Sequence, residues 1–201
     1  MGAENVKMNS KQVLLLGLAG SGKTLLLKKL MDMKATDVVD VAIDSTLGFN
    51  NIELDLFNAK LTLWDLGGDQ ISRSYWPTFY RNLKVDIVIF VICLSDEDNL
   101  NKSLKELLNC INEEELKGAK FFVIFNYIVD EKDRKNFLET KYKEEFEKKE
   151  LLIQEIKENV IHDIDNRMKH EIFDISKLKQ GENKTNELLE KMFDIKLNEK
   201  K

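Results

Sequence analysis

The feature that constrains this chain most is a glycine-rich motif near its N-terminus. Residues 17–24 are Gly-Leu-Ala-Gly-Ser-Gly-Lys-Thr, which matches every fixed position of G-x-x-x-x-G-K-[ST]. The apolar run Val13–Leu16 precedes the motif and an amphipathic stretch follows from Lys23, so the setting is strand, turn and helix. In that setting successive backbone N–H groups form a nest for β- and γ-phosphates. The motif therefore predicts a bound nucleotide, but it does not separate a GTPase from an ATPase or a kinase.

Each residue of this loop has a predicted role at the phosphates. The Lys23 ammonium would reach the phosphate oxygens as a point charge, and the Thr24 hydroxyl would coordinate Mg²⁺. The remaining predicted contacts come from the backbone of Gly17, Leu18, Ala19, Gly20, Ser21 and Gly22.

An α/β fold is predicted from the order of the other segments. Apolar runs predict buried strands over 85–94, 121–125 and 172–175, and the alternating segments 51–57 and 60–64 predict a hairpin. Helices are expected from residue 23, over 100–116 and over 183–197. We predict a mostly parallel six-stranded sheet with helices on both faces and ligand loops at the carboxyl ends of its strands. The 201 residues fit a flexible segment, 1–10, and one nucleotide-binding domain, 11–201.

The stretch from Phe137 to Ile164 predicts an extended helix. Its apolar residues recur every three, four or seven positions, and Glu144/Lys148 is an i,i+4 pair on the outer side. We interpret this helix as packing on the sheet, with docking of a partner as the alternative.

Charge and cysteine content limit the partners. The net charge is −5 and Lys alternates with Glu instead of clustering, which argues against nucleic acid as a partner. We find neither a signal peptide nor an apolar run of roughly 18 residues, so a cytoplasmic protein is expected, with membrane association peripheral or absent. Cys93 and Cys110 lack the spacing of metal ligands, and Cys93 is expected to be a buried strand thiol.

A second motif lies after the hairpin. Trp64-Asp65-Leu66-Gly67-Gly68 places Asp65 at a strand end, where it would hold Mg²⁺, and Gly68 has no side chain to block its N–H from the γ-phosphate. Together with Thr46-Leu47-Gly48-Phe49-Asn50, these residues make the chain resemble the Arf/Arl family of small GTPases, whose members carry T-I-G-F-N and W-D-x-G-G. The resemblance implies a P-loop small-GTPase fold, GTP or GDP with Mg²⁺, and Thr46 contacting both the metal and the γ-phosphate.

The resemblance also implies protein partners. Phe49, Trp64 and Phe79 would form an exposed aromatic surface that effectors recognise in the GTP state, and ordinary core packing of these rings is the alternative. An exchange factor and a GTPase-activating protein are expected partners as well. Order and disorder of two switch loops, controlled by γ-phosphate and Mg²⁺, would be the mechanism.

The chain departs from the family pattern at the catalytic position. The family has glutamine directly after Gly-Gly, whereas here Asp69 follows Gly68 and glutamine comes one step later, as Gln70. Glutamine orients the attacking water through one acceptor and one donor. An ionised aspartate has no donor, and its charge would repel the γ-phosphate. We expect slow hydrolysis, unless the loop shifts by one residue and Gln70 substitutes.

A second departure concerns the base. The family has N-K-x-D, and here Asn126 is followed by Tyr127, Ile128, Val129 and Asp130, so the aspartate is one residue late. We expect GTP to bind with weaker discrimination, unless a bulge returns Asp130 to the guanine ring. Ser176 and Lys177 are the best candidates for the last loop, where a backbone N–H would meet the guanine oxygen.

Three functions are compatible with these motifs. The leading hypothesis is an Arf-like switch that recruits effectors and hydrolyses GTP slowly. The alternative is a nucleotide-binding scaffold without hydrolysis. A small-molecule kinase would share only the phosphate loop, and no arginine-rich lid segment is present to close over a transferred phosphate.

Overall fold

The computed structural model describes residues 10–32, 48–56, 59–126, 168–173, 175, 178–179 and 182–193. Several predictions from the sequence lie outside these residues: the flexible segment 1–10 except residue 10, Thr46, Asp130, the extended helix over 137–164, and the pair Ser176 and Lys177.

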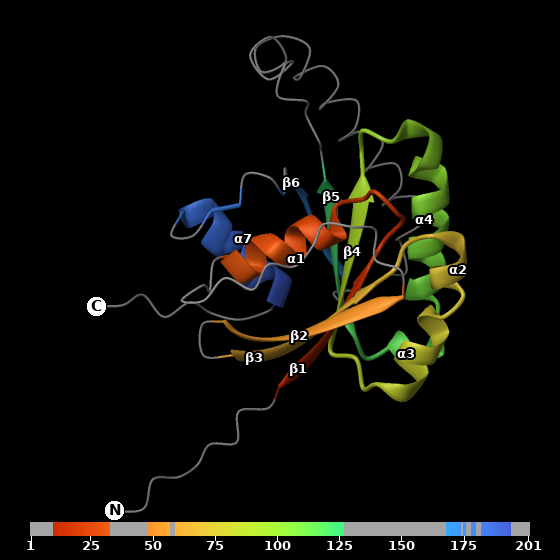
Figure 1. Ribbon diagram of the computed structural model, residues 1–201, viewed down its shortest axis with the longest axis horizontal. Helices are drawn as coiled ribbons and strands as arrows, with labels where there is room; N and C mark the ends of the chain where they lie inside the picture. The colour runs from red at the N-terminus through yellow and green to blue at the C-terminus, as the bar shows by residue number, and fades with distance from the viewer. Residues whose placement is uncertain are drawn as a thin grey trace, which may run out of the picture.

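The described chain builds one six-stranded sheet in the order β2-β3-β1-β4-β5-β6 (Figure 1). The strands are β1 (Lys11–Leu16), β2 (Phe49–Leu56), β3 (Ala59–Leu66), β4 (Ile87–Cys93), β5 (Lys120–Asn126) and β6 (Met168–Phe173). Only the β2–β3 pair is antiparallel, and the other four pairs are parallel. The predicted mostly parallel α/β sheet is confirmed.

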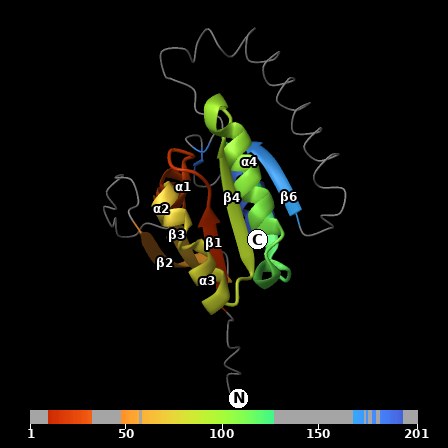
Figure 2. The ribbon, with the colours of Figure 1, turned by 90° about the vertical axis from the view of Figure 1, so that its right-hand side faces the viewer.

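Helices cover both faces of the sheet, because the central strands are apolar on both sides. The helices are α1 (Lys23–Asp32), α2 (Gln70–Arg73), α3 (Trp76–Asn82), α4 (Glu97–Ile111), the 3-10 turn η1 (Glu114–Leu116) and α7 (Asn183–Phe193). In β1, Val13 and Leu15 pack in the core with residues of α1 and α7, while Leu14 and Leu16 pack with residues of α3 and α4. Figure 2 looks onto the second face, where α4 lies over β4.

Most elements differ from the sequence prediction by a few residues at their ends, and two differ more. The helix expected over 100–116 is α4 followed by the separate turn η1, and α4 begins earlier because the Asp96 carboxylate accepts a hydrogen bond from the Asn99 N–H at 3.3 Å. The last strand was expected over 172–175 but is Met168–Phe173, because its backbone pairs with β5 from Phe121 onward. The polar residues at the start of β6 interrupt the apolar pattern by which the sequence analysis recognised strands.

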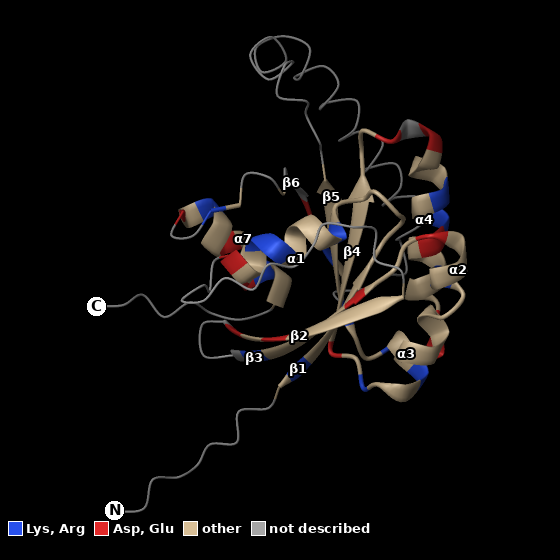
Figure 3. Cartoon of the chain, viewed as in Figure 1, with Lys and Arg blue, Asp and Glu red and all other residues tan. Residues whose placement is uncertain are grey.

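Two further features of the described chain bear on its partners. None of its helices is long and apolar enough to cross a membrane. Acidic and basic residues both occur along α4 and α7, whereas α1 carries three lysines and one aspartate at its last position (Figure 3).

Candidate nucleotide-binding site

The glycine-rich loop between β1 and α1 has a backbone that only glycine adopts readily. Gly17, Gly20 and Gly22 have φ angles of 141°, 76° and 102°. A β-carbon on Gly17 would lie 2.2 Å from the Val91 carbonyl oxygen, and one on Gly22 would lie 2.4 Å from the Asn126 side-chain nitrogen. At Gly17 and Gly22 the loop is therefore packed directly against β4 and β5, with no room for a side chain at these two positions.

Lys23 lies buried at this loop. Its Nζ donates hydrogen bonds to the carbonyl oxygens of Gly17 and Leu18, both at 2.9 Å. Burial lowers the pKa of Lys23 to about 8, while the negative charges of Asp65 and Asp69 act in the opposite direction. A cation that is poorly solvated and held against the loop is well placed to be stabilised by phosphate oxygens.

Thr24 and Asp65 form the candidate metal site. The Thr24 Oγ1 at the start of α1 donates to the Asp65 Oδ2 near the end of β3 at 3.0 Å, and Asp65 is fully buried. Mg²⁺ is commonly held by one or two protein oxygens together with phosphate oxygens and waters. This pair beside the phosphate loop fits that ion. In the described part of the chain, groups of three or more His, Cys, Asp or Glu residues that could hold a metal are absent.

Gly68 lies against the phosphate loop. Its carbonyl oxygen accepts from the Ala19 N–H at 3.1 Å, and a β-carbon on Gly68 would lie 2.4 Å from the Gly17 carbonyl oxygen. The structure thus brings together the two motifs, which residues 25–63 separate in the sequence.

Asn126 connects the phosphate loop to the last nucleotide loop. Its side-chain nitrogen donates to the Ser21 carbonyl oxygen at 2.9 Å, and its Oδ1 accepts from the Ile175 N–H at 3.2 Å. Asn126 therefore joins the end of β5 to Ile175, the residue directly before the predicted loop residues Ser176 and Lys177 in the sequence. The contact of Asn126 with a base stays a prediction.

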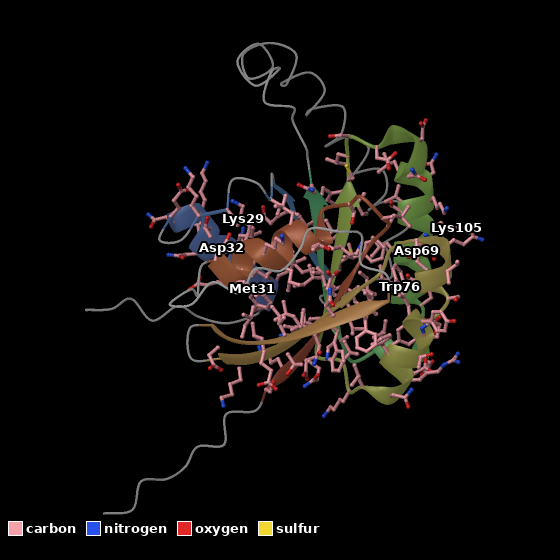
Figure 4. All side chains as sticks on the ribbon, viewed as in Figure 1. Lys29, Met31, Asp32, Asp69, Trp76 and Lys105 are labelled. Atoms are coloured by element: carbon pink, nitrogen blue, oxygen red, sulfur yellow. The ribbon has the colours of Figure 1, made fainter. Side chains whose placement is uncertain are left out.

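Asp69 and Gln70 stand at the start of α2. The Asp69 carboxylate accepts hydrogen bonds from the N–H groups of Ile71 and Ser72, at 2.9 and 3.0 Å, and from the Ser72 hydroxyl. These bonds lower the pKa of Asp69 below its ordinary value, the Ser72 hydroxyl most of all. Gln70 is exposed, and Figure 4 shows Asp69 beside α2. Asp69 is the N-cap of this helix, a role that the sequence analysis missed although aspartate is a preferred N-cap residue.

Phe49, Trp64 and Phe79 form one aromatic cluster. Their ring centroids lie 5.0 to 6.1 Å apart, the range in which aromatic pairs attract. Phe49 is 52% exposed, while Trp64 and Phe79 are half-buried against the core on the α3–α4 face. The core-packing alternative therefore holds in part for two of the rings, and all three keep some exposure.

Three positioning residues were not found by sequence reasoning. The Gln12 Oε1 accepts from the Trp64 Nε1 at 2.9 Å, the Arg73 Nη1 donates to the Gly68 carbonyl oxygen at 2.8 Å, and the Trp76 Nε1 donates to the Gly67 carbonyl oxygen at 3.0 Å. Such contacts between elements have no local sequence signal.

A family model described as the ADP-ribosylation factor family matches residues 3–192. ADP-ribosylation factor-like protein 1 of Drosophila melanogaster is 37% identical over 115 residues, which cover 57% of this chain and 60% of that protein. ADP-ribosylation factor D of Dictyostelium discoideum is 38% identical over 117 residues, which cover 58% of this chain and 51% of that protein. The chain thus spans about half to three fifths of the length of these relatives.

A solved structure also matches. It is the Arl6 BBS3 small GTPase of Trypanosoma brucei with the bound nucleotide analogue GppNp, with a TM-score of 0.64 at 21% identity. The match covers 92% of this chain and 96% of that chain. At this identity the likeness is one of fold.

Proposed function

The chain belongs to the ADP-ribosylation factor family of small GTP-binding proteins, and from that premise we propose that it is a GTP-dependent switch that recruits effectors and hydrolyses GTP slowly. The observation that carries the proposal is the meeting of the glycine loop, Lys23 and the Thr24–Asp65 pair at one edge of the sheet. The backbone of residues 17–22 would hold the phosphates, and Thr24, Asp65 and Thr46 would hold Mg²⁺. The bound metal would neutralise charge on the β- and γ-phosphates.

Slow hydrolysis follows from the position of Asp69. Its carboxylate accepts three hydrogen bonds from α2 and has no donor with which to orient a water. Restoring the family residue with Asp69→Gln is expected to raise the single-turnover rate of GTP hydrolysis at least about tenfold. Wild-type hydrolysis as fast as that of ordinary family members stimulated by an activating protein would contradict this part of the proposal. If Gln70→Ala hydrolyses GTP at the wild-type rate, Gln70 does not take the place of the family's catalytic glutamine.

Guanine selectivity is proposed to be weak. Loss of an aspartate that accepts hydrogen bonds from the guanine edge would reduce affinity roughly ten- to a hundredfold. Asn126, together with backbone groups at Ser176 and Lys177, would keep part of the base contact. Titration with GTP and with ATP tests this, because equal affinities would exclude a compensating contact from Asp130.

The aromatic cluster is the proposed effector surface. Phe49 is the most exposed of the three residues, and Trp64 is held in place by a hydrogen bond to Gln12. Aromatic side chains that become buried in an interface commonly carry much of its binding energy. We propose a cytoplasmic location, with any membrane contact peripheral and made through partners, and exchange and activating proteins that act on the switch loops.

A second candidate function is a nucleotide-binding scaffold that does not hydrolyse GTP. The engagement of Asp69 as a helix cap favours it, as does the altered base motif at Val129. The nucleotide that copurifies with the protein separates the two functions. Retained GTP supports the scaffold or a locked switch, and GDP supports a cycling enzyme.

A further inference from the structure

A pocket of about 430 Å³ lies between α3 and α4, on the side of the sheet opposite α1 and α7. This volume is at the lower end of the range of ligand pockets, so it suits one long side chain or a small molecule. Trp76, Pro77 and Tyr80 of α3 form its mostly apolar wall. The aromatic cluster contributes no residue to the lining. The pocket is therefore separate from the proposed effector surface.

The opposite wall of the pocket carries two carboxylates. Glu106 already has a partner, because the Arg73 Nε lies 3.3 Å from one of its oxygens. Within the described part of the chain, Glu113 forms no ion pair with an arginine or a lysine, and its side chain is half-buried. Asn109 and Asn112 line the pocket beside it and offer amide oxygens as further acceptors. The lining thus holds one carboxylate more than it holds cations.

The end of α4 adds to the negative potential at the pocket. This helix has 15 residues and ends at Ile111, so the partial negative charge of its last carbonyl groups lies next to Glu113 in the chain. Its last turn contains no basic residue, and Lys105 extends away from the sheet into solvent (Figure 4). Burial raises the pKa of Tyr80 and of Cys110, and the negative charge of Glu113 raises both further. A cation would be stabilised at this place.

From these observations we propose that the pocket between α3 and α4 binds an arginine side chain of a partner protein. The planar guanidinium has several N–H donors, which match the Glu113 carboxylate and the amide oxygens of Asn109 and Asn112. The methylene stem of the arginine would lie along the apolar wall at Pro77. An anion such as phosphate would instead meet two carboxylates and the negative end of a helix. This binding needs no nucleotide, so it stands or falls independently of the proposed function.

NMR titration of the full ¹⁵N-labelled chain with N-acetylarginine amide tests the proposal. N-acetylcitrulline amide is the neutral probe of nearly the same shape. Two variants that remove the same charge at neighbouring positions, Glu113→Gln and Glu114→Gln, are compared with wild type. Glu114 is the matched control, because its side chain is 77% exposed, pairs with Lys117 and does not line the pocket. The Glu113 side chain does not cap η1, so Glu113→Gln should keep the fold, which the dispersion of the spectrum checks.

We expect saturable shifts of the Asn109 and Asn112 side-chain amides and of the Trp76 indole N–H, with a Kd on the order of 1–10 mM. Glu113→Gln should weaken binding about tenfold or more, and Glu114→Gln less than about twofold. Equal shifts with the citrulline probe, or wild-type affinity in Glu113→Gln, would overturn the inference. Shifts of the same groups with sodium phosphate would assign an anion site, and shifts that grow with protein concentration alone would assign a second copy of the chain. Either of these results would overturn it as well.

Discussion

Gly68 illustrates at the residue scale how the lack of a side chain sets the distance between two loops. A β-carbon there would lie 2.4 to 2.5 Å from backbone atoms of Gly17, Leu18 and Ala19, and backbone atoms cannot move aside cheaply. The close approach lets the Gly68 carbonyl oxygen accept from the Ala19 N–H. The packing of the two loops therefore requires glycine at position 68 of this chain.

Replacement of Gly68 by alanine should destabilise the protein. Gly68→Ala is expected to lower the free energy of unfolding by about 1–3 kcal/mol, since the added methyl group overpacks a closed contact. Chemical denaturation monitored by tryptophan fluorescence measures the change. The control is Gly118→Ala, because a β-carbon on Gly118 meets nothing within 4 Å. Equal stability of the two variants would show that the loops are not in contact as described.

The two cysteines differ in how far their side chains are buried. Cys110 is buried on α4, and burial together with the nearby Glu106 and Glu113 raises the pKa of its thiol to about 12. Cys93 ends β4 and is half-buried, not fully buried as the sequence indicated.

Alkylation with iodoacetamide at pH 8, followed by mass spectrometry, should separate these thiols. The thiolate is the reactive form, and a raised pKa leaves almost all of Cys110 as the thiol at this pH. We expect Cys93 to be modified first and Cys110 to react only after denaturation. Modification of Cys110 in the folded protein at a rate equal to that of Cys93 would contradict its burial.

At the scale of elements, the tie between α2 and α4 is the contact that positions the switch loop. Arg73 joins the Gly68 carbonyl oxygen to Glu106, and both partners are mostly shielded from water. Arg81 forms a comparable bridge with Glu115, but its side chain is 62% exposed. The two arginines therefore form a natural pair for comparison.

Arg73→Gln is expected to lower the free energy of unfolding by about 1–3 kcal/mol, because it removes charged hydrogen bonds from a shielded site. Arg81→Gln should change it by less than about 0.5 kcal/mol, since exposed bridges contribute little. Thermal or denaturant unfolding of the two variants checks the contrast. Similar losses in both would mean that Arg73 does not anchor the loop.

Some strands and loops could be predicted from the sequence, and others could not. The apolar runs of β4 and β5 were predicted because both of their faces are buried, and the phosphate loop was predicted because its glycines and Lys23 stand at fixed spacing. The strand β6 was placed too late because Lys169 and Glu171 interrupt its apolar pattern. The amide of Asn126 meets Ser21 across 105 positions, and contacts of that kind depend on the fold.

At the scale of the whole molecule, one edge of the sheet gathers the predicted chemistry. The glycine loop follows β1, Asp65 lies at the end of β3 and Asn126 ends β5, so parallel strands bring their carboxyl ends to the same place (Figure 1). The aromatic cluster joins β2, β3 and α3. A ligand at this edge would touch the loops that lead to that cluster.

The most direct test of this account is calorimetric titration of the nucleotide-free protein with GTP in the presence of Mg²⁺. Wild-type protein is expected to bind, and Lys23→Ala should bind about ten- to a hundredfold more weakly, because it loses charged hydrogen bonds to phosphate. The matched control is Lys29→Ala in the last turn of the same helix, which should bind like wild type. Absence of binding by wild-type protein to GTP, GDP and ATP with Mg²⁺ present would contradict the account, as would wild-type affinity in Lys23→Ala.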